Sequence, residues 1–363
     1  MEEKLRNWIT EIQGADLAAM DRARAYQARL AKPPGSLGRL EDIAVQLAGV
    51  TGHVRNTMEK RRILVLCADN GALEEGISVT PRSVTAAQAA NMTRHKTGMS
   101  AMAFAFGDEV TVVDVGIADP YDCPDILYRN LAKGTRNLLR EKAMTREETV
   151  RAILIGMELA EQAGKDGVNA VGVGEMGIGN TTTSAAVLAA LTGLPVEAVT
   201  GRGGGLTDEA FLRKKQVIGD ALRLHQPDPR DPIAVISSVG GLDIAAMCGV
   251  YLGCARARIP VVMDGFISIV AALCAARLCE HVKGYLFPSH ASFERGYEAA
   301  AAELGAQPFL LLGMRLGEGS GCPLAFQVLK AACAVVDGMA TFEGAAINDS
   351  YLDEIRDKDC FTT

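Results

Sequence analysis

The chain has 363 residues, of which 48% are hydrophobic and 22% charged, a balance typical of a folded globular protein rather than a disordered one. Its formal net charge of −7 argues against a nucleic-acid-binding protein, because such proteins usually carry an excess of Lys and Arg. The first residues are charged and form no apolar signal sequence, and no run of about 18 apolar residues occurs. We therefore expect a soluble, cytoplasmic protein that binds neither nucleic acid nor membrane.

The first sixty residues predict helices, with Leu5, Ile9 and Ile12 on one apolar face and Leu40, Ile43 and Leu47 on a later one. From about residue 62, short apolar runs alternate with Gly-rich or polar turns and Ala-rich stretches of helical periodicity. The apolar runs predict strands at Ile63–Cys67, Val110–Val115, Ala170–Val173, Ala234–Ser237, Pro260–Met263, Lys283–Phe287 and Phe309–Leu312.

Helices are expected between these strands. Their predicted ranges are Ser83–Thr97, Arg146–Ala163, Thr182–Leu191, Leu242–Ala257, Ile267–Leu278, Ser292–Leu304 and Pro323–Val336. Alternating strands and helices predict a doubly wound, mostly parallel α/β sheet flanked by helices, with function in the loops at the carboxyl ends of the strands. The last thirty or so residues also look helical. We expect residues 1–60 and 338–363 to form a small helical domain, and residues 61–337 a large α/β domain.

The loop Gly172-Val-Gly-Glu-Met-Gly-Ile-Gly-Asn-Thr-Thr-Thr183 follows an apolar strand and opens a helix. Glycines let the backbone approach a ligand closely, and free amides at a helix start favour an anion such as phosphate. Asn180 and the Thr hydroxyls suit either a helix cap or that same phosphate. The spacing matches neither a Walker A loop nor a dinucleotide-binding loop. We favour phosphate binding over a Gly-rich turn with capping residues.

A second Gly-rich loop, Thr200-Gly-Arg-Gly-Gly-Gly-Leu206, precedes a helix that carries Arg213, Lys214 and Lys215. The glycines and a nearby lysine would complete a phosphate pocket, with the lysine acting as a point charge. A turn followed by a solvated basic helix face explains this segment equally well. The residues alone leave both alternatives open.

The third loop, Met314-Arg-Leu-Gly-Glu-Gly-Ser-Gly321, places Glu318 between glycines after an apolar run. Such a carboxylate has little reason to stabilise a core and lies at the usual catalytic edge of a parallel sheet. The alternative is a first-turn carboxylate favoured by a helix dipole.

Two Asp-containing loops also follow strands, at residues 68–71 and 263–266. Asp69 and Asp264 suit hydrogen bonding to a ribose or the ordering of a neighbouring loop, although structural turns explain both almost as well. His290, in Pro288-Ser-His290, is a weaker ligand-binding candidate.

The nine cysteines include no C-x-x-C pair, and the five histidines are dispersed without metal-ligand spacing. We therefore expect reduced core cysteines and no metal or other cofactor.

Taken together, these segments resemble the nicotinate-nucleotide:dimethylbenzimidazole phosphoribosyltransferase family, which makes the lower-ligand nucleotide of cobamides. The resemblance covers nearly the whole chain and rests on residues 32–41, 67–92, 172–182, 226–231, 262–266, 288–290 and 314–321. It implies transfer of the 5-phosphoribosyl group of nicotinate mononucleotide to 5,6-dimethylbenzimidazole or a related base, in cobalamin biosynthesis. The implied partners are these small molecules, and the implied assembly is a homodimer. The rival interpretations are transfer to adenine or a phenol, and a non-catalytic nucleotide-binding protein.

The family's motifs also imply roles for individual residues. Glu318 matches the general base. Glu175 lines the active site as a second catalytic candidate, either stabilising positive charge that develops on the ribose or holding Glu318. Three further groups follow from the matched positions: Gly177, Gly179, Asn180, Thr181, Gly203 and Lys214 around the phosphoribosyl group; Thr80 and Gln88 in the aromatic-base pocket; and Met314 and Leu316 in the same pocket. Asn70 stands where family members often have His, and Thr80 where they often have Ser, so these departures bear on the acceptor base more than on the reaction.

The implied mechanism needs one base and no acid. A positively charged nicotinate nucleotide releases nicotinate with a neutral pyridine ring, and Glu318 takes the imidazole N–H proton of the acceptor. Attack opposite the leaving group predicts inversion from a β- to an α-nucleotide. We expect no metal in this reaction, because the phosphate is a binding handle rather than the reacting group.

Overall fold

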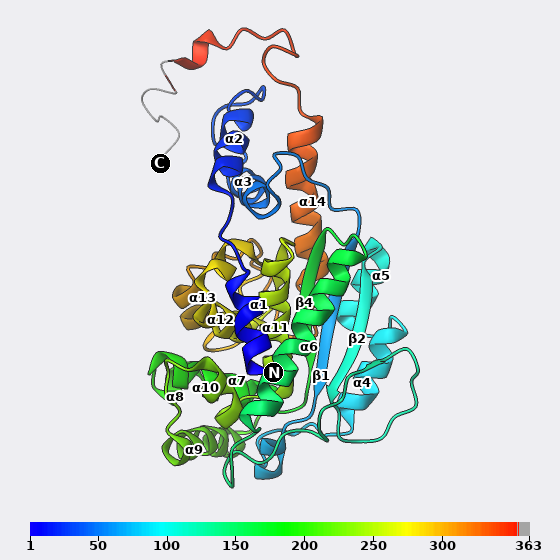
Figure 1. Cartoon of the computed structure of the whole chain (residues 1–363), viewed down its shortest axis with the longest axis vertical. Helices are drawn as coiled ribbons and strands as arrows, with labels where there is room; N and C mark the ends of the chain where they lie inside the picture. The colour runs from blue at the N-terminus through cyan, green and yellow to red at the C-terminus, as the bar shows by residue number, and fades with distance from the viewer. Residues whose placement is uncertain (354, 356–363) are drawn as a thin grey trace.

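The computed structural model describes residues 1–353 and 355, and at its centre is a six-stranded parallel sheet (Figure 1). The strands are β1 (Arg61–Ala68), β2 (Glu109–Gly116), β3 (Leu127–Tyr128), β4 (Ala170–Met176), β5 (Val261–Met263) and β6 (Leu286–Pro288). Every neighbouring pair in the order β3-β2-β1-β4-β5-β6 is parallel. The predicted doubly wound parallel sheet is confirmed.

The order of the strands fixes where a ligand can bind. Strands β2 and β3 lie on one side of β1, toward one edge of the sheet. Strand β4 pairs with the other side of β1, and β5 and β6 follow it toward the opposite edge. The connections therefore diverge between β1 and β4. In open parallel sheets, a crevice forms at the carboxyl ends of the strands on either side of such a point.

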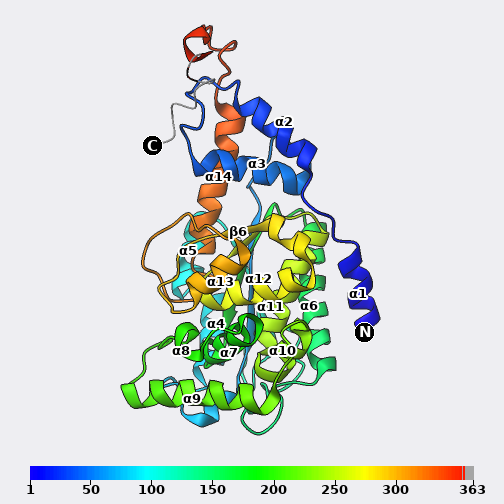
Figure 2. The ribbon, with the colours of Figure 1, turned by 90° about the vertical axis from the view of Figure 1, so that its left-hand side faces the viewer.

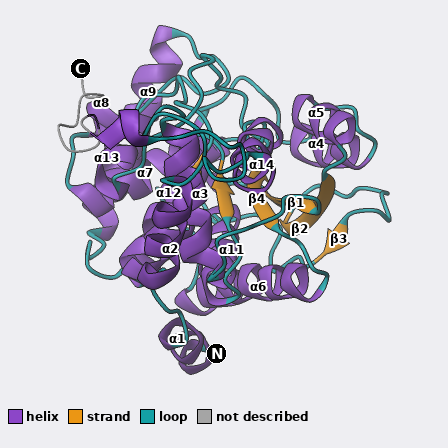
Figure 3. Cartoon of the chain, turned by 90° about the horizontal axis from the view of Figure 1, so that it is seen from above, coloured by secondary structure: helices purple, strands orange, loops and turns teal. Residues whose placement is uncertain are grey.

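Helices cover both faces of the sheet, as the view from above shows (Figure 3). One face carries α4 (Val84–Thr93), α5 (Gly98–Phe106) and α14 (Cys322–Gly338), and the other carries α6 (Arg146–Lys165), α11 (Leu242–Arg256) and α12 (Phe266–Leu278). Besides α1 (Glu2–Thr10), α2 (Leu17–Gln27) and α3 (Arg39–Thr51) near the start of the chain, the other described helices are α7 (Asn180–Thr192), α8 (Val196–Val199), α9 (Asp208–His225), α10 (Pro232–Val239), α13 (Tyr297–Leu304) and the 3-10 segments η1 (Gly71–Glu75), η2 (Glu280–Tyr285) and η3 (Ser350–Leu352).

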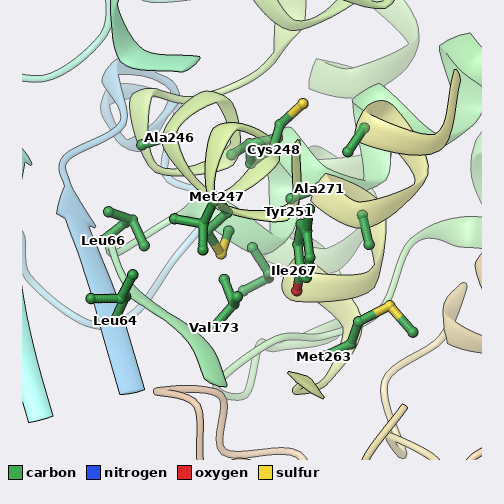
Figure 4. Packing of buried hydrophobic residues seen from close by; sticks show 14 of the residues in the cluster. Leu64, Leu66, Val173, Ala246, Met247, Cys248, Tyr251, Met263, Ile267 and Ala271 are labelled. Atoms are coloured by element: carbon green, nitrogen blue, oxygen red, sulfur yellow. The ribbon is translucent and has the colours of Figure 1, made fainter. Parts of the chain in front are cut away.

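The main core lies between the central strands and the helices α11 and α12 (Figure 4). Leu64 and Val173, from β1 and β4, are buried beside Met247 and Tyr251 of α11. The Tyr251 hydroxyl satisfies its hydrogen-bonding capacity inside this core through Ser268 Oγ at 2.5 Å. Removal of so much apolar surface from water provides the main stabilisation of the layers and holds the strand ends in place.

Segments from the two halves of the chain, residues 17–51 and 322–342, meet above the sheet. Helices α2 (Leu17–Gln27) and α3 (Arg39–Thr51) pack together, and α3 also packs against the far half of the long α14 (Figures 1 and 2). Backbone bonds from Ala31 to Ala340, at 2.9 Å, and from Phe342 to Arg29, at 2.9 Å, tie the segments together. By contrast, α1 (Glu2–Thr10) packs along α6. The division into domains 1–60 plus 338–363 and 61–337 remains a prediction.

Three of the predicted elements are wrong. Ala234–Ser237 lies in helix α10, which begins with Pro232 and is capped by the Asp231 carboxylate accepting the Ala234 N–H at 3.0 Å. This helix is buried almost all round, so its sequence lacks the periodicity that separates a helix from a strand. Phe309–Leu312 forms a single bridge, between Leu310 and His290, and no strand. After Gly338, the described residues up to Leu352 form mainly turns and the short η3 rather than the expected helical structure, and residues 354 and 356–363 of that prediction lie outside the described residues.

Lys283–Phe287 is corrected in part, because residues up to Tyr285 form η2 and only its end belongs to β6. The two-residue strand β3 was not predicted, since so short a segment carries no periodic signal. No helix among the described residues is long and apolar enough to cross a membrane.

Candidate active site

A cavity of about 230 Å³ lies at the carboxyl ends of β4 and β5, beside the point where the connections diverge. Its walls come from residues 77–88, 175–181, 202–206, 264–268 and 315–318, together with Ser292 and Glu294. All residues that the family's motifs assigned to the site line it except Lys214 and Met314. The structure therefore brings together, in one place, three loops that the sequence singled out separately.

Glu318 lines this cavity in an unusual backbone conformation. Its φ of +64° lies in the left-handed region, between Gly317 at +80° and Gly319 at +86°. A left-handed conformation is costly for a residue with a side chain and persists only where the surroundings enforce it. The neighbouring glycines adopt it without steric penalty, which explains the Gly-Glu-Gly pattern.

Two buried carboxylates hold this loop. The Glu318 N–H donates to Glu175 Oε1 at 3.2 Å. The amides of Gly319 and Gly321 donate to the two oxygens of Asp264, at 3.1 and 2.7 Å. Asp264 thus orders the neighbouring loop, one of the two roles that its position after β5 suggested.

The Glu318 loop also rests directly on strand β4. A Cβ atom on Gly174 would lie 2.5 Å from the carbonyl oxygen of Glu318, closer than real Cβ contacts allow. Only glycine at this position permits the loop to approach the strand so closely. The position of the Glu318 carboxylate is therefore set by backbone contact with the sheet.

The Glu318 carboxylate is mostly buried and only partly satisfied. Its Oε1 accepts a hydrogen bond from the Gln88 amide at 3.3 Å, whereas Oε2 is buried without a hydrogen bond of normal geometry to the described residues. Burial raises the pKa of this carboxyl, and the nearby polar groups of Thr97, Met99 and Gln88 offset part of the rise. A carboxylate with a raised pKa in the wall of a cavity is well suited to accept a proton.

Glu175 and Glu318 each expose only 6% of their surface, and burial raises the pKa of both carboxyl groups. For Glu175 the pKa rises to about 8, although the hydrogen bond from Asn180 opposes the shift. The Glu175 carboxyl is consequently mostly neutral near pH 7. Two carboxyl groups with different environments can take different roles.

The Gly-rich loop of residues 201–205 and helix α9 meet the first turn of α7. Lys214 is almost fully buried, and its Nζ donates to Thr181 Oγ1 at 2.8 Å. Burial lowers the pKa of Lys214 to about 8, while nearby Glu294 opposes the shift. Lys215 instead lies over the Phe211 ring, 4.1 Å from its centroid. Lys214 is thus the lysine that reaches the cavity wall.

Other candidate residues lie outside the cavity. Met314 contributes its carbonyl oxygen to the Phe293 N–H at 3.0 Å and does not line the cavity. His290 is buried, with Nδ1 3.0 Å from Ser289 Oγ, and also does not line it. Asp69 orders a neighbouring loop through the Ala118 N–H at 2.8 Å.

The polar residues at the site that were not predicted include Glu294 and Asp243. Glu294 lines the cavity and accepts the Gly203 N–H at 3.1 Å. Asp243 is fully buried behind the cavity and accepts a hydrogen bond from Asn180 at 3.0 Å. A signal for Asp243 was present, because a charged residue in the otherwise apolar helix α11 needs a buried partner. The short polar segment around Glu294 offered no comparable signal.

Comparison with known proteins gives a consistent result. A model of a family described as phosphoribosyltransferase matches residues 12–347. A nicotinate-nucleotide–dimethylbenzimidazole phosphoribosyltransferase of Clostridium perfringens is 47% identical over 357 residues, covering 98% of this chain and 99% of the relative. The enzyme of the same name from Geobacter sulfurreducens is 46% identical over 340 residues, covering 93% and 97%. The crystal structure of CobT from Thermus thermophilus superimposes with a TM-score of 0.87 at 39% identity, covering 92% of this chain and 99% of that one.

Proposed function

Because the chain belongs to the nicotinate-nucleotide–dimethylbenzimidazole phosphoribosyltransferase family, we propose that Glu318 is the general base of its transfer reaction. The enzyme transfers the 5-phosphoribosyl group of nicotinate mononucleotide to dimethylbenzimidazole, releasing nicotinate and α-ribazole 5′-phosphate. The observation that supports Glu318 is the position of its carboxyl in the cavity wall, between the walls formed by Gln88 and Glu175, with a pKa that burial raises. A carboxyl with a raised pKa at the cavity is suited to take the acceptor N–H proton.

The reaction is a single displacement at C1′ of the ribose. One imidazole nitrogen of the acceptor forms the new C1′–N bond as the bond from C1′ to the nicotinate nitrogen breaks. The electron pair of the broken bond neutralises the pyridinium ring, so the leaving group needs no proton. The N–H proton on the other imidazole nitrogen passes to Glu318. Attack from the face opposite nicotinate inverts C1′ and gives the α-nucleotide.

Glu175 has a different role in this proposal. Its carboxyl is mostly neutral near pH 7, since burial raises its pKa to about 8, and it accepts the backbone N–H of Glu318. A neutral group contributes little to stabilising positive charge on the ribose. We therefore assign Glu175 to positioning Glu318 rather than to electrostatic stabilisation of the transition state.

The two substrates occupy opposite ends of the cavity. The phosphate is bound by Lys214, Thr181 and the glycines at positions 177, 179 and 203, which lie where α7 begins and where the Gly-rich loop meets α9. The acceptor base lies against Thr80, Gln88 and Leu316. Met314 adjoins this end through the segment that carries Leu316. A lysine ammonium and backbone amides are suited to a phosphate, whereas the apolar Leu316 surface is suited to an aromatic ring.

We further propose that the enzyme is a cytoplasmic homodimer that acts in cobalamin lower-ligand synthesis. The support is the near-full-length match to relatives of this name. Size-exclusion chromatography with light scattering would measure the mass in solution, and a monomer at micromolar concentration would contradict the proposed dimer.

Product analysis tests the proposed function. Purified protein is incubated with nicotinate mononucleotide and an equimolar mixture of dimethylbenzimidazole, benzimidazole, adenine and phenol, and products are identified by liquid chromatography and mass spectrometry. We expect α-ribosyl phosphates of the benzimidazoles together with an equal amount of free nicotinate. A donor left intact with every base would contradict the proposal. Preferential use of adenine or phenol would retain the reaction and change the acceptor.

A further inference from the structure

Asn180, the first residue of α7, lines the cavity with every N–H group already engaged. Its backbone N–H donates to the Gly177 carbonyl at 3.1 Å. Its side-chain Nδ2 donates to Glu175 Oε2 at 2.5 Å and to Asp243 Oδ2 at 3.0 Å. An amide nitrogen carries two hydrogens, so both side-chain donors are used. Asn180 therefore has no N–H left with which to bind a phosphate oxygen.

The orientation of this amide is determined by Asp243. That residue is fully buried in the first turn of α11, where its Oδ1 accepts the Ile244 N–H at 2.9 Å, and it does not line the cavity. Burial raises its pKa to about 6, so the carboxyl is mostly ionised at neutral pH and can only accept hydrogen bonds. The nitrogen of the Asn180 amide must face Asp243, because the amide oxygen would be repelled.

With its nitrogen directed toward the two carboxyl groups, the amide has its oxygen on the other side. Asn180 Oδ1 makes no hydrogen bond with the described residues, and the side chain belongs to the cavity wall. Asn180 thus offers the substrate an acceptor and no donor.

We infer that Asp243, together with Glu175, holds Asn180 so that its Oδ1 accepts a hydrogen bond from a ribose hydroxyl of the donor nucleotide. This inference rests on the proposed function. In nicotinate mononucleotide, the phosphate dianion and the nicotinate carboxylate are acceptors only, and the pyridinium nitrogen carries no hydrogen. The 2′- and 3′-hydroxyls are the only groups of that molecule that can donate to Oδ1. Asp243 is accordingly a positioning residue that acts through Asn180.

A thermodynamic cycle tests the contact. The Kd of nicotinate mononucleotide and of its 2′-deoxy and 3′-deoxy counterparts is measured by titration calorimetry for the wild type and for Asn180→Ala. We expect the wild type to bind one of the two deoxy donors about 3- to 10-fold more weakly than natural nicotinate mononucleotide, because one hydrogen bond is lost. Asn180→Ala should bind the natural donor more weakly than the wild type does, by the same factor. This variant should bind the deoxy donor no more weakly than the natural donor.

Thr181→Val provides a contrasting variant in the neighbouring position. Thr181 lies beside Lys214 in the proposed phosphate site, so its substitution should weaken inhibition by inorganic phosphate and leave the discrimination between natural and deoxy donors intact. Asn180→Ala should do the opposite. Weaker phosphate inhibition in Asn180→Ala, or unchanged discrimination between the donors, would overturn the inference.

Asp243→Asn tests the positioning role. An Asn at position 243 can donate to the Asn180 oxygen, so the Asn180 amide is free to turn and present its NH₂ group to the cavity. We expect this variant to lose the discrimination between natural and deoxy donors while retaining inorganic phosphate inhibition. Retained discrimination would show that Asp243 does not set the orientation. Circular dichroism reports whether the variant folds, and if it does not, the Asn180→Ala cycle decides alone.

The same experiment separates this inference from the proposed function. Calorimetric Kd values need no turnover, so they can be read even if wild-type enzyme forms no product with dimethylbenzimidazole. Failure of product formation with an intact hydroxyl effect would contradict the reaction and leave the Asn180 contact standing. Product formation without the hydroxyl effect would contradict only the inference drawn here.

Discussion

The carboxyl of Glu175 accepts the backbone N–H of Glu318 at 3.2 Å, although the two residues are 143 positions apart in the sequence. The Glu175 carboxyl therefore holds the backbone of Glu318, which carries the second carboxyl group of the site. This relationship explains how two acidic side chains share one cavity without equal roles: Glu175, whose pKa burial raises to about 8, fixes geometry, and Glu318 is the proposed base.

Replacement of Glu318 by Gln should remove the base while preserving the shape of the loop. We expect kcat to fall by about 10²- to 10⁴-fold, the usual contribution of a positioned general base, with little change in KM for nicotinate mononucleotide. Glu280→Gln, at an exposed position, serves as the control for a charge change and should retain wild-type rates. Steady-state kinetics measure both, and near-normal turnover of Glu318→Gln would disprove the assignment.

The raised pKa of Glu175 predicts a pH dependence of stability. Burial raises this pKa from 4.5 to about 8, so between these values the native state retains a proton that the unfolded chain has lost. The stabilisation is complete below the lower value and is lost as pH rises through the upper one. The free energy of unfolding, measured with urea, should therefore fall between about pH 6 and about pH 9 in the wild type. The fall should exceed that of Glu175→Gln by on the order of a few kcal/mol.

Comparison of the two proteins at each pH cancels the contribution of the other buried carboxyl groups, including Asp243 and Asp264, whose pKa values burial also raises. Equal pH slopes for the wild type and Glu175→Gln would show that Glu175 is not the group responsible.

The adjacent lysines of α9 provide a matched pair of substitutions. Lys214→Met should weaken binding of nicotinate mononucleotide by about 10- to 100-fold, the range for loss of a hydrogen bond to a charged group. Lys215→Met should have little effect, because that side chain lies over Phe211. Burial lowers the pKa of Lys214 to about 8, so donor affinity should also decline as pH rises past this value in the wild type. Calorimetric titrations across this pH range test both statements, and equal losses in the two variants would refute the assignment.

The contact between the Glu318 loop and β4 can be tested with a single methyl group. Gly174→Ala would bring a Cβ atom to 2.5 Å from the Glu318 carbonyl oxygen, so the loop must move away from the strand. We expect a folded protein with kcat reduced by about 10-fold or more, because small displacements of a catalytic group are costly. Gly338→Ala, where an added Cβ meets nothing within 4 Å, is the control. Normal kcat in Gly174→Ala would show that the loop position is not critical.

Much of the fold was predictable because parallel α/β sheets have a strong local signal. The apolar runs at β1, β2 and β4 stand between polar turns, and each gave a correct strand. Helix α10 failed for a physical reason: a helix buried on all sides is apolar on all sides and reads like a buried strand. The run near Leu310 failed because a strand needs a partner along its length, and this segment finds one at a single position.

The location of the candidate site could be predicted from a general rule about parallel sheets, without knowledge of the contacts within the site. Loops after parallel strands meet at one edge of the sheet, so Glu175 and Glu318 were expected to come together. The sequence could not show that the Glu175 carboxyl accepts the backbone N–H of Glu318, or that Asp243 lies behind Asn180. These relationships depend on distances between segments far apart in the chain, and on burial, which sets the pKa differences.

The two walls of the cavity differ in how they are attached to the sheet. Glu318, Glu175 and Asp264 form one wall, joined by hydrogen bonds and anchored on β4 and β5. The opposite wall, residues 77–88, includes the largely exposed Val79 and meets Glu318 through the Gln88 amide. Thr85 also ties this wall to the loop after β4, because its hydroxyl accepts the Ile178 N–H at 3.2 Å. Only the exposed part around Val79 can vary without breaking these contacts. Preference for a new acceptor is therefore expected to arise there first, while the residues that carry the chemistry are inherited unchanged.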